Sequence, residues 1–338
     1  MVIIEPFYDC YLPQAQFSGG KVIGVPMIPP ARRSRSELVF SYELDEDYYD
    51  KSGETAKNPN LNAIKDDWKI DFDLLRQKIN HKTKLLILNT PNNPTGKILS
   101  EAELDEIAKI VKDFPNLYIL SDEVYEHMVF DEYIKLPRMA TRLFDRTISI
   151  MSAGKVFSAT GIRIGWAIGP ANLIKQINSV HQYSSFCLFD PLQNTIADCL
   201  EAANNEYKGQ KTYYDWLRIH YANRRNFFMS EIIKTEYFKN SNFFVPEGGY
   251  FVVADISDEE VAKKNYGFEE DNLTGEKDYS FDYSKDFNFL LNMAHERKVV
   301  GIPLTPFYTQ ENKHLGENLV RLAFCKEVKT LVTAFERL

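Results

Sequence analysis

Lys84-Leu-Leu-Ile-Leu-Asn89 is a short, continuous apolar run in the first third of the chain. Runs of this kind are typical of strands that are buried on both faces of a parallel sheet. Ser100-Glu-Ala-Glu103 follows in the capping-box pattern that begins a helix, and an apolar stripe from Leu104 to Val111 continues it. Two more apolar strands are expected at 117–120 and 147–151. This alternation predicts an α/β fold with a mainly parallel sheet flanked by helices.

The second half of the chain predicts a smaller domain. The 338 residues suffice for two domains of about 150 residues each. A long helix is expected from about 211 to 235, and after residue 240 the pattern becomes strand, acidic loop, helix, strand and final helix. We expect a large domain over 1–205, and a linking helix with a small C-terminal α/β domain over 206–338. The polar segments 31–70 and 257–286 are expected to be surface loops.

Composition and charge exclude several classes of protein. The net charge of −8 argues against a nucleic-acid binder, which usually carries a basic surface. No apolar run reaches the roughly 18 residues that a membrane span needs. The four cysteines lack CxxC spacing and the six histidines lack ligand spacing, so we expect neither a metal site nor a disulfide framework.

Lys155 is the first candidate for chemistry. It closes Ser152-Ala-Gly-Lys155, which we expect to form a Gly-containing loop directly after the strand at 147–151. Ligands of α/β proteins bind outside the carboxyl ends of such strands, and partial burial there makes a lysine amine a usable nucleophile. Taken alone, an exposed loop lysine would explain the residue better. Penicillin-binding proteins share the S-x-x-K spacing, but their S-D-N and K-T-G motifs do not occur here.

Two polar segments are expected beside Lys155. Ser121-Asp-Glu-Val-Tyr125 follows the strand at 117–120, so Asp122 is either a helix N-cap or a site carboxylate. A carboxylate there would keep the ring nitrogen of a heterocyclic cofactor protonated. Prolines stiffen the segment from Asn89 to Gly96, which is either a plain turn or a support that presents the amide donor of Asn93.

Two arginines indicate anionic ligands. The run Gly161-Ile-Arg-Ile-Gly-Trp-Ala-Ile-Gly169, read as a strand, places Arg163 on one face among small residues, where a phosphate could approach closely. Its G-x-x-x-G spacing occurs in membrane helix dimers, but the run is too short and contains an arginine. Arg321 lies inside the apolar segment 318–324 and needs an anionic partner, either a structural carboxylate or the carboxylate of an amino acid.

Together and in this order, these motifs resemble those of the fold type I, class I/II aminotransferases, which depend on pyridoxal 5′-phosphate. The sequence looks closest to the group of kynurenine aminotransferase, glutamine transaminase and cysteine-conjugate β-lyase. The similar segments run along the whole chain: Glu5–Tyr11, Asn89–Gly96, Ser121–Tyr125, Ser152–Gly165, Val180–Gln182, Glu247–Phe251, Asp255–Ser257 and Arg321–Phe324.

The resemblance implies a role for each candidate residue. Lys155 would join the cofactor covalently and later move a proton at the substrate Cα. Arg163 stands where many relatives have lysine, a tolerable change for a phosphate contact. The other roles divide by ligand: Tyr8, Asn93, Asp122 and Tyr125 for the cofactor ring, Ser152 and Arg163 for its phosphate, and Asn93 and Arg321 for the substrate carboxylate.

The implied activity is transfer of an amino group from an aromatic or sulfur-containing amino acid, kynurenine or glutamine to a 2-oxo acid. One alternative is β-elimination from cysteine S-conjugates, which differs only in the leaving group. Another is a non-catalytic chain that dimerises with or regulates a full-length relative. The resemblance also implies a homodimer, in the cytoplasm or in mitochondria.

The sequence departs from the family pattern in two places. Phe186-Cys187 stands where close relatives often have Phe-His. This segment is expected to reach the partner subunit's site, so the change from histidine to cysteine should affect which substrates are accepted. The family also has a substantial segment before the position of Met1, including a Gly-rich phosphate loop. We therefore expect an N-terminally truncated chain with weakened cofactor binding.

Overall fold

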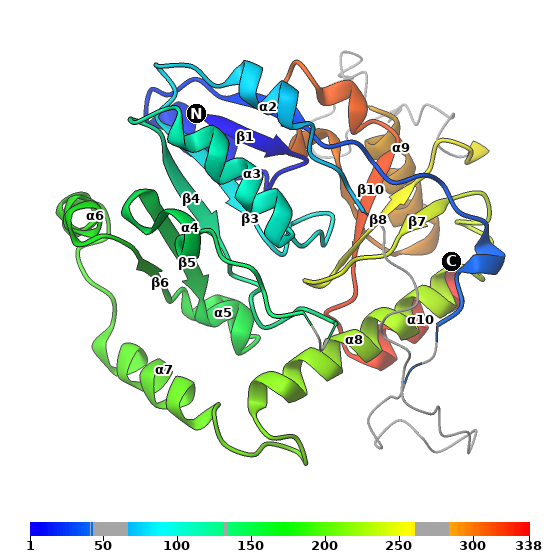
Figure 1. Cartoon of the computed structure of the whole chain (residues 1–338). Helices are drawn as coiled ribbons and strands as arrows, with labels where there is room; N and C mark the ends of the chain where they lie inside the picture. Colours follow the sequence, from blue (N-terminus) through cyan, green and yellow to red (C-terminus); the bar gives the residue numbers. More distant parts are fainter. Residues whose placement is uncertain (41, 43–66, 132–133, 261–283) are drawn as a thin grey trace, which may run out of the picture.

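The computed structural model describes residues 1–40, 42, 67–131, 134–260 and 284–338. This part of the chain folds around two separate sheets (Figure 1). Most of the candidate residues lie at the ends of strands of the larger sheet or in the segments next to them, and the smaller sheet carries Arg321. The α/β class that the strand pattern predicts is confirmed.

The larger sheet has six strands in the order β2-β1-β3-β4-β5-β6. Neighbours from β2 to β5 pair in parallel, whereas β6 runs antiparallel to β5. The apolar run at 85–88 becomes β3, whose central residues are buried as a strand inside a parallel sheet requires. The strands are β1 (Val2–Glu5), β2 (Ile23–Pro26), β3 (Leu85–Asn89), β4 (Tyr118–Asp122), β5 (Thr147–Ser152) and β6 (Gly165–Ile168).

Helices with the predicted caps accompany this sheet. Figure 1 shows α2 (Phe72–Lys78) and α3 (Glu101–Lys112) lying together over it. Ser100 Oγ accepts a hydrogen bond from the Glu103 amide at 3.2 Å, and the Glu103 carboxylate accepts one from the Ser100 amide at 2.8 Å, so the capping box is confirmed. Further helices are α1 (Tyr11–Phe17), α4 (Ala140–Leu143), α5 (Ala153–Val156), α6 (Ala171–Ser184), α7 (Asp190–Ala202) and α8 (Tyr213–Ile232).

The smaller sheet has the order β7-β8-β10-β9, and its neighbouring strands pair antiparallel. The long helix α8, predicted at 211–235, lies beside the final helix α10 (Figure 1). The strand, helix, strand and final helix predicted after residue 240 are confirmed, with two strands at each strand position, whereas most of the predicted acidic loop lies outside the described residues. These elements are β7 (Asn242–Phe244), β8 (Phe251–Asp255), α9 (Lys285–Asn292), β9 (Ile302–Pro303), β10 (Leu319–Ala323) and α10 (Val328–Arg337).

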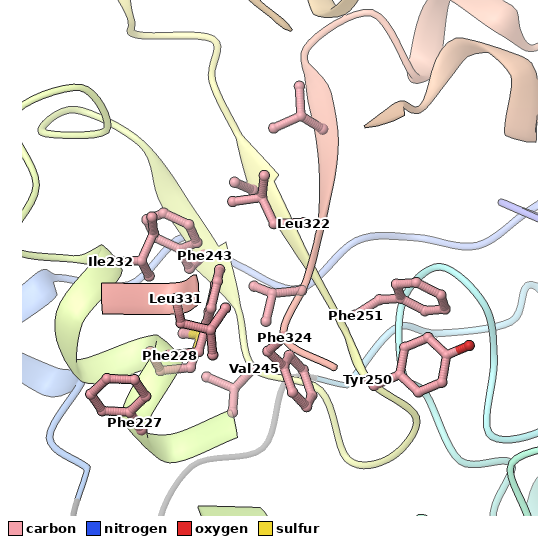
Figure 2. Close-up of a cluster of buried hydrophobic side chains, with 14 of the residues drawn as sticks. Phe227, Phe228, Ile232, Phe243, Val245, Tyr250, Phe251, Leu322, Phe324 and Leu331 are labelled. Atoms are coloured by element: carbon pink, nitrogen blue, oxygen red, sulfur yellow. The ribbon is translucent and has the colours of Figure 1, made fainter. Parts of the chain in front are cut away.

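Apolar packing joins the two sheets. One buried cluster gathers side chains of α8, the smaller sheet and α10, and Figure 2 shows Phe228, Leu322 and Leu331 among them. A second cluster contains Leu86 of the larger sheet together with Val253 of the smaller sheet. A site between the sheets is therefore held by continuous core packing. The domain boundary between residues 205 and 206 stays a prediction.

Two local predictions are wrong. The strand expected over 161–169 begins only at Gly165, because Thr160–Ile162 form a 3₁₀ turn and Arg163 adopts left-handed backbone angles (φ 55°, ψ 36°). Arg163 therefore shares no strand face with the neighbouring glycines. Lys155 lies in the one-turn helix α5 rather than on an open loop. The segments predicted as surface loops, 31–70 and 257–286, fall mostly outside the described residues.

Candidate active site

The carboxyl ends of β3, β4 and β5 meet at one edge of the larger sheet. Asn89 pairs in register with Asp122, and its side-chain nitrogen donates to the main-chain oxygen of Asp122 at 3.0 Å. The strand β5 lies on the other side of β4 and ends just before α5. Because parallel strands end side by side, the segments that carry Asn93, Asp122 and Lys155 leave the sheet at the same edge.

Asp122 is a buried carboxylate at the end of β4. Its Oδ2 accepts a hydrogen bond from the Tyr11 hydroxyl, and its Oδ1 accepts one from the Val124 amide at 3.2 Å. Burial raises the pKa of Asp122, whereas these two hydrogen bonds and the charge of Lys155 lower it. The residues after Asp122 form turns rather than a helix, so the N-cap alternative is wrong.

The amine of Lys155 lies among aromatic side chains. Its Nζ donates a hydrogen bond of 2.8 Å to the Tyr250 hydroxyl. The same nitrogen lies 5.5 Å from the ring centroids of both Tyr125 and Tyr250. Lys155 is only half-exposed, so the alternative of an exposed loop lysine is wrong. Tyr125, whose ring this amine approaches, lies three residues after Asp122, and Asp122 pairs with Ile150 of β5, the strand that leads into α5. Amine and carboxylate therefore lie at the same end of two neighbouring strands.

Arg321 reaches the same place from β10. Its Nη1 donates to Asn93 Oδ1 at 2.7 Å, and its guanidinium lies 4.2 Å from the Phe251 ring centroid and 4.9 Å from that of Phe307. Burial lowers the pKa of Arg321, which marks a cation with little access to water. Within the described residues no carboxylate forms an ion pair with it, so the guanidinium can accept an external carboxylate.

The remaining predicted residues border this centre. The Tyr8 ring meets that of Tyr11 edge to face, with centroids 5.5 Å apart. A hydrogen bond with Cys10, followed by burial, raises the pKa of Tyr8 to about 12, while the charge of Arg163 lowers it. Arg163 itself is exposed, and the hydroxyl of Ser152 makes no capping bond to α5. The exposed guanidinium and the uncommitted hydroxyl suit the edge of a site that binds an anion.

The structure adds two side chains that the sequence did not single out. Tyr11 bonds the carboxylate of Asp122, and Tyr250 bonds the amine of Lys155. Both belong to segments that resemble the family, but a motif does not show which of several adjacent aromatic rings points inward. The side-chain oxygen of Asn93 accepts the bond from Arg321, whereas its side-chain nitrogen is a separate group, so the predicted role of Asn93 as an amide donor stays a prediction.

The site combines an amine, a buried carboxylate, phenol hydroxyls and a guanidinium. Such a set suits covalent attachment of an aldehyde and the binding of a carboxylate.

In the part of the chain that the structure describes, no group of three or more His, Cys, Asp or Glu side chains could hold a metal ion. None of the described helices has the length and apolar character needed to cross a membrane.

Known sequences are similar to this chain along most of its length. The chain matches the family "Aminotransferase class I and II" over residues 50–338. The kynurenine–oxoglutarate transaminase of Dictyostelium discoideum is 33% identical over 344 residues, which cover 100% of this chain and 70% of that protein. Kynurenine–oxoglutarate transaminase 1 of Rattus norvegicus is 30% identical over 341 residues, which cover 100% of this chain and 70% of that protein.

Solved structures share the fold. The crystal structure of Bna3p from Saccharomyces cerevisiae has 33% sequence identity and a TM-score of 0.74, and the match covers 100% of this chain and 70% of that one. N-succinyldiaminopimelate aminotransferase from Mycobacterium tuberculosis has 29% identity and a TM-score of 0.72, and the match covers 99% of this chain and 70% of that one. The family match over most of the sequence, supported by these identities, shows that the chain belongs to the class I and II aminotransferases, enzymes that act on amino acids and 2-oxo acids.

Proposed function

We propose that the chain is a pyridoxal 5′-phosphate-dependent transaminase that moves an amino group from an aromatic or sulfur-containing amino acid, kynurenine or glutamine to a 2-oxo acid. Lys155 is the residue that carries the cofactor. The observation behind the proposal is that the buried carboxylate of Asp122 ends β4 and the half-buried amine of Lys155 follows the end of β5, the strand next to β4. The names of two relatives, both kynurenine–oxoglutarate transaminases, support the substrate class.

The side chains present fit this cofactor. Its aldehyde requires an amine, its ring nitrogen a carboxylate, its ring hydroxyl a hydrogen-bonding partner and its phosphate a cation. Lys155, Asp122, Tyr125 and Arg163 offer these groups in that order, and Ser152 adds a hydroxyl that does not cap α5. Burial raises the pKa of Asp122 overall, and the hydrogen bond from Tyr11 counters part of that rise in favour of the charged form.

When bound, the cofactor supplies an electron sink that stabilises negative charge at the substrate Cα. Asp122 holds a proton on the ring nitrogen through direct charge pairing. Lys155 takes the proton from the substrate Cα and returns it later, as a positioned general base and acid. Arg321 binds the substrate carboxylate through parallel N–H donors, with Asn93 beside it, and this orients Cα toward the lysine.

Aromatic rings around Arg321 support the proposed amino donors. Phe251 and Phe307 lie against the guanidinium, and the ring of Tyr8 is 38% exposed nearby. Aromatic and thioether side chains pack well against such rings. Phe251 and Phe307 are themselves buried, so of these three rings Tyr8 is the one that an aromatic side chain of a substrate held at Arg321 would contact.

Replacement of Lys155 tests the proposal. With cofactor, kynurenine or phenylalanine as donor and 2-oxoglutarate as acceptor, the parent chain should absorb in the visible and turn over. Borohydride reduction should fix the cofactor on Lys155, as peptide mass mapping would show. Lys155→Ala should lose both the absorbance band and turnover, whereas the surface variant Lys109→Ala should keep both. An unchanged rate in Lys155→Ala would end the proposal.

The same assays separate the alternatives. Release of pyruvate from a cysteine S-conjugate without any 2-oxo acid would assign β-elimination. Failure of the parent chain to take up cofactor in equilibrium dialysis would assign a non-catalytic role. We also propose a homodimer, on the family resemblance, and light scattering at about twice the chain mass of 39.2 kDa would support it.

A further inference from the structure

We propose that Tyr250 is a second catalytic residue, the partner that holds the amine of Lys155 whenever that amine is not joined to the cofactor. The proposal rests on the proposed role of Lys155. The contact that motivates it is the hydrogen bond of 2.8 Å between Lys155 Nζ and the Tyr250 hydroxyl. Among the described residues, Tyr250 is the side chain to which the amine of Lys155 donates a hydrogen bond. This bond holds the nitrogen in the site.

A pair of phenol rings surrounds the amine. Tyr125 and Tyr250 meet edge to face, with centroids 5.2 Å apart and planes at 87°. Lys155 Nζ lies 5.5 Å from the Tyr125 centroid, within the range where a ring face attracts a cation. It meets Tyr250 through the hydroxyl instead. Burial, followed by the charge and hydrogen bond of Tyr250, raises the pKa of Tyr125 well above its usual value. Lys155 thus bonds Tyr250, and Tyr250 packs edge to face against Tyr125.

The backbone around Tyr250 is firmly anchored. Its carbonyl oxygen accepts a hydrogen bond of 3.0 Å from the Phe324 amide at the end of β10. The amide of Gly249 donates to Met128 at 2.9 Å, and that of Gly248 donates to Gly96 at 3.0 Å. Gly249 has a φ of +75°, which L side chains rarely adopt, so a glycine is required beside Tyr250.

The ring itself has a defined direction. Figure 2 shows Tyr250 at the edge of the apolar cluster, with its hydroxyl pointing away from Phe228 and Leu331. The cluster holds the ring, and the hydroxyl is left to bond the lysine. A lysine side chain has several freely rotating bonds, so a fixed partner restricts where its amine can lie. Loss of the hydroxyl should therefore slow the steps in which Lys155 attaches or moves a proton, with little effect on substrate binding.

Tyr250→Phe tests this role, with Tyr221→Phe as the matched control. Tyr221 packs against Tyr250 at 6.1 Å between centroids, but its hydroxyl contacts Ser158 and not the lysine. Each variant loses one buried hydroxyl from the same aromatic group. The first readout is the rate at which the cofactor-depleted full chain forms the visible absorbance band after cofactor is added. The second is the separation of kcat from KM, together with the kinetic isotope effect of a donor deuterated at Cα.

We expect Tyr250→Phe to form the band about tenfold more slowly and to lower kcat by a similar factor. KM should change little, and the isotope effect should rise because proton transfer becomes more rate-limiting. Tyr221→Phe should resemble the parent. Equal band formation, kcat and isotope effect in the two variants would overturn the role of Tyr250. If borohydride still attached the cofactor to Lys155 in both variants, that result would leave the proposed function standing. A band that persists in Lys155→Ala would instead remove the proposed function.

Discussion

Arg321 in β10 and Asn93 in the segment after β3 are joined by a hydrogen bond of 2.7 Å between guanidinium and amide oxygen. These residues are 228 positions apart in the sequence and come from different sheets. The bond fixes the guanidinium beside the end of the larger sheet, where Lys155 and Asp122 also lie. The proposed carboxylate site therefore depends on the docking of the two sheets.

Replacement of Arg321 should weaken substrate binding. A hydrogen bond to a charged group contributes about 1.5–3 kcal/mol, so Arg321→Gln should raise KM for the amino donor by about tenfold to a hundredfold. Arg321→Lys should recover only part of the loss, because an ammonium cannot bind a carboxylate with two parallel donors. Initial rates over a range of donor concentrations measure this. Arg76→Gln, which breaks a surface pair with Asp113, is the control and should leave KM unchanged. An unaltered KM in Arg321→Gln would contradict the assignment.

The Tyr11–Asp122 bond should set the acid side of the pH–rate profile. The Tyr11 hydroxyl lowers the pKa of Asp122, so its removal in Tyr11→Phe should let the pKa of that carboxyl rise. A protonated Asp122 cannot pair with a charged ring nitrogen, so the acid limb of kcat should move to higher pH. Asp122→Asn should lower kcat by at least about a hundredfold at every pH. Profiles that superimpose for Tyr11→Phe and the parent would argue against this coupling.

Arg163 should contribute to phosphate binding in a salt-dependent way. Arg163→Gln should weaken cofactor affinity by about tenfold at low ionic strength, and Arg163→Lys should stay close to the parent because it keeps the charge. The side chain is exposed, so the difference between the variants should shrink in about 1 M salt. Fluorescence titration with the cofactor at two salt concentrations measures both effects. A salt-independent loss would point to a structural role at this left-handed position.

Gly96 should be essential for the stability of the segment that carries Asn93. It has a φ of +73°, and a Cβ there would lie 2.3 Å from Pro246 Cβ. Gly96→Ala should reduce the free energy of unfolding by about 2–4 kcal/mol through crowding and an unfavourable backbone angle. Gly161→Ala meets nothing within 4 Å and should stay within about 0.5 kcal/mol of the parent. Urea denaturation compares the two, and equal midpoints would contradict the prediction.

Glu5 should make stability depend on pH. Its carboxylate accepts hydrogen bonds from the Thr309 amide and the Asn312 side chain, but burial raises the pKa of Glu5 overall. A carboxyl group whose pKa is higher in the folded than in the unfolded protein makes the folded state less stable as pH rises. For Glu5 this loss begins near the unfolded pKa of about 4.3 and continues up to the folded pKa. The stability of Glu5→Gln relative to the parent should therefore increase across this window. Urea denaturation at several pH values measures the difference, and a pH-independent difference would show that Glu5 does not titrate with unfolding.

The sequence by itself determined the elements and the chemical types in the site. Local patterns predict the strand at 84–89, the Ser100 cap and the final helices, because apolar spacing and caps act between residues a few positions apart. Segments similar to the family also identified Lys155, Asp122 and Arg321 as candidates. Tertiary structure alone decided which side chains meet. Tyr11 bonds Asp122 across 111 positions, and Tyr250 bonds Lys155 across 95. Such contacts depend on how the sheets pack, which no local pattern encodes, and the left-handed backbone of Arg163 depends in the same way on its surroundings rather than on its own preference.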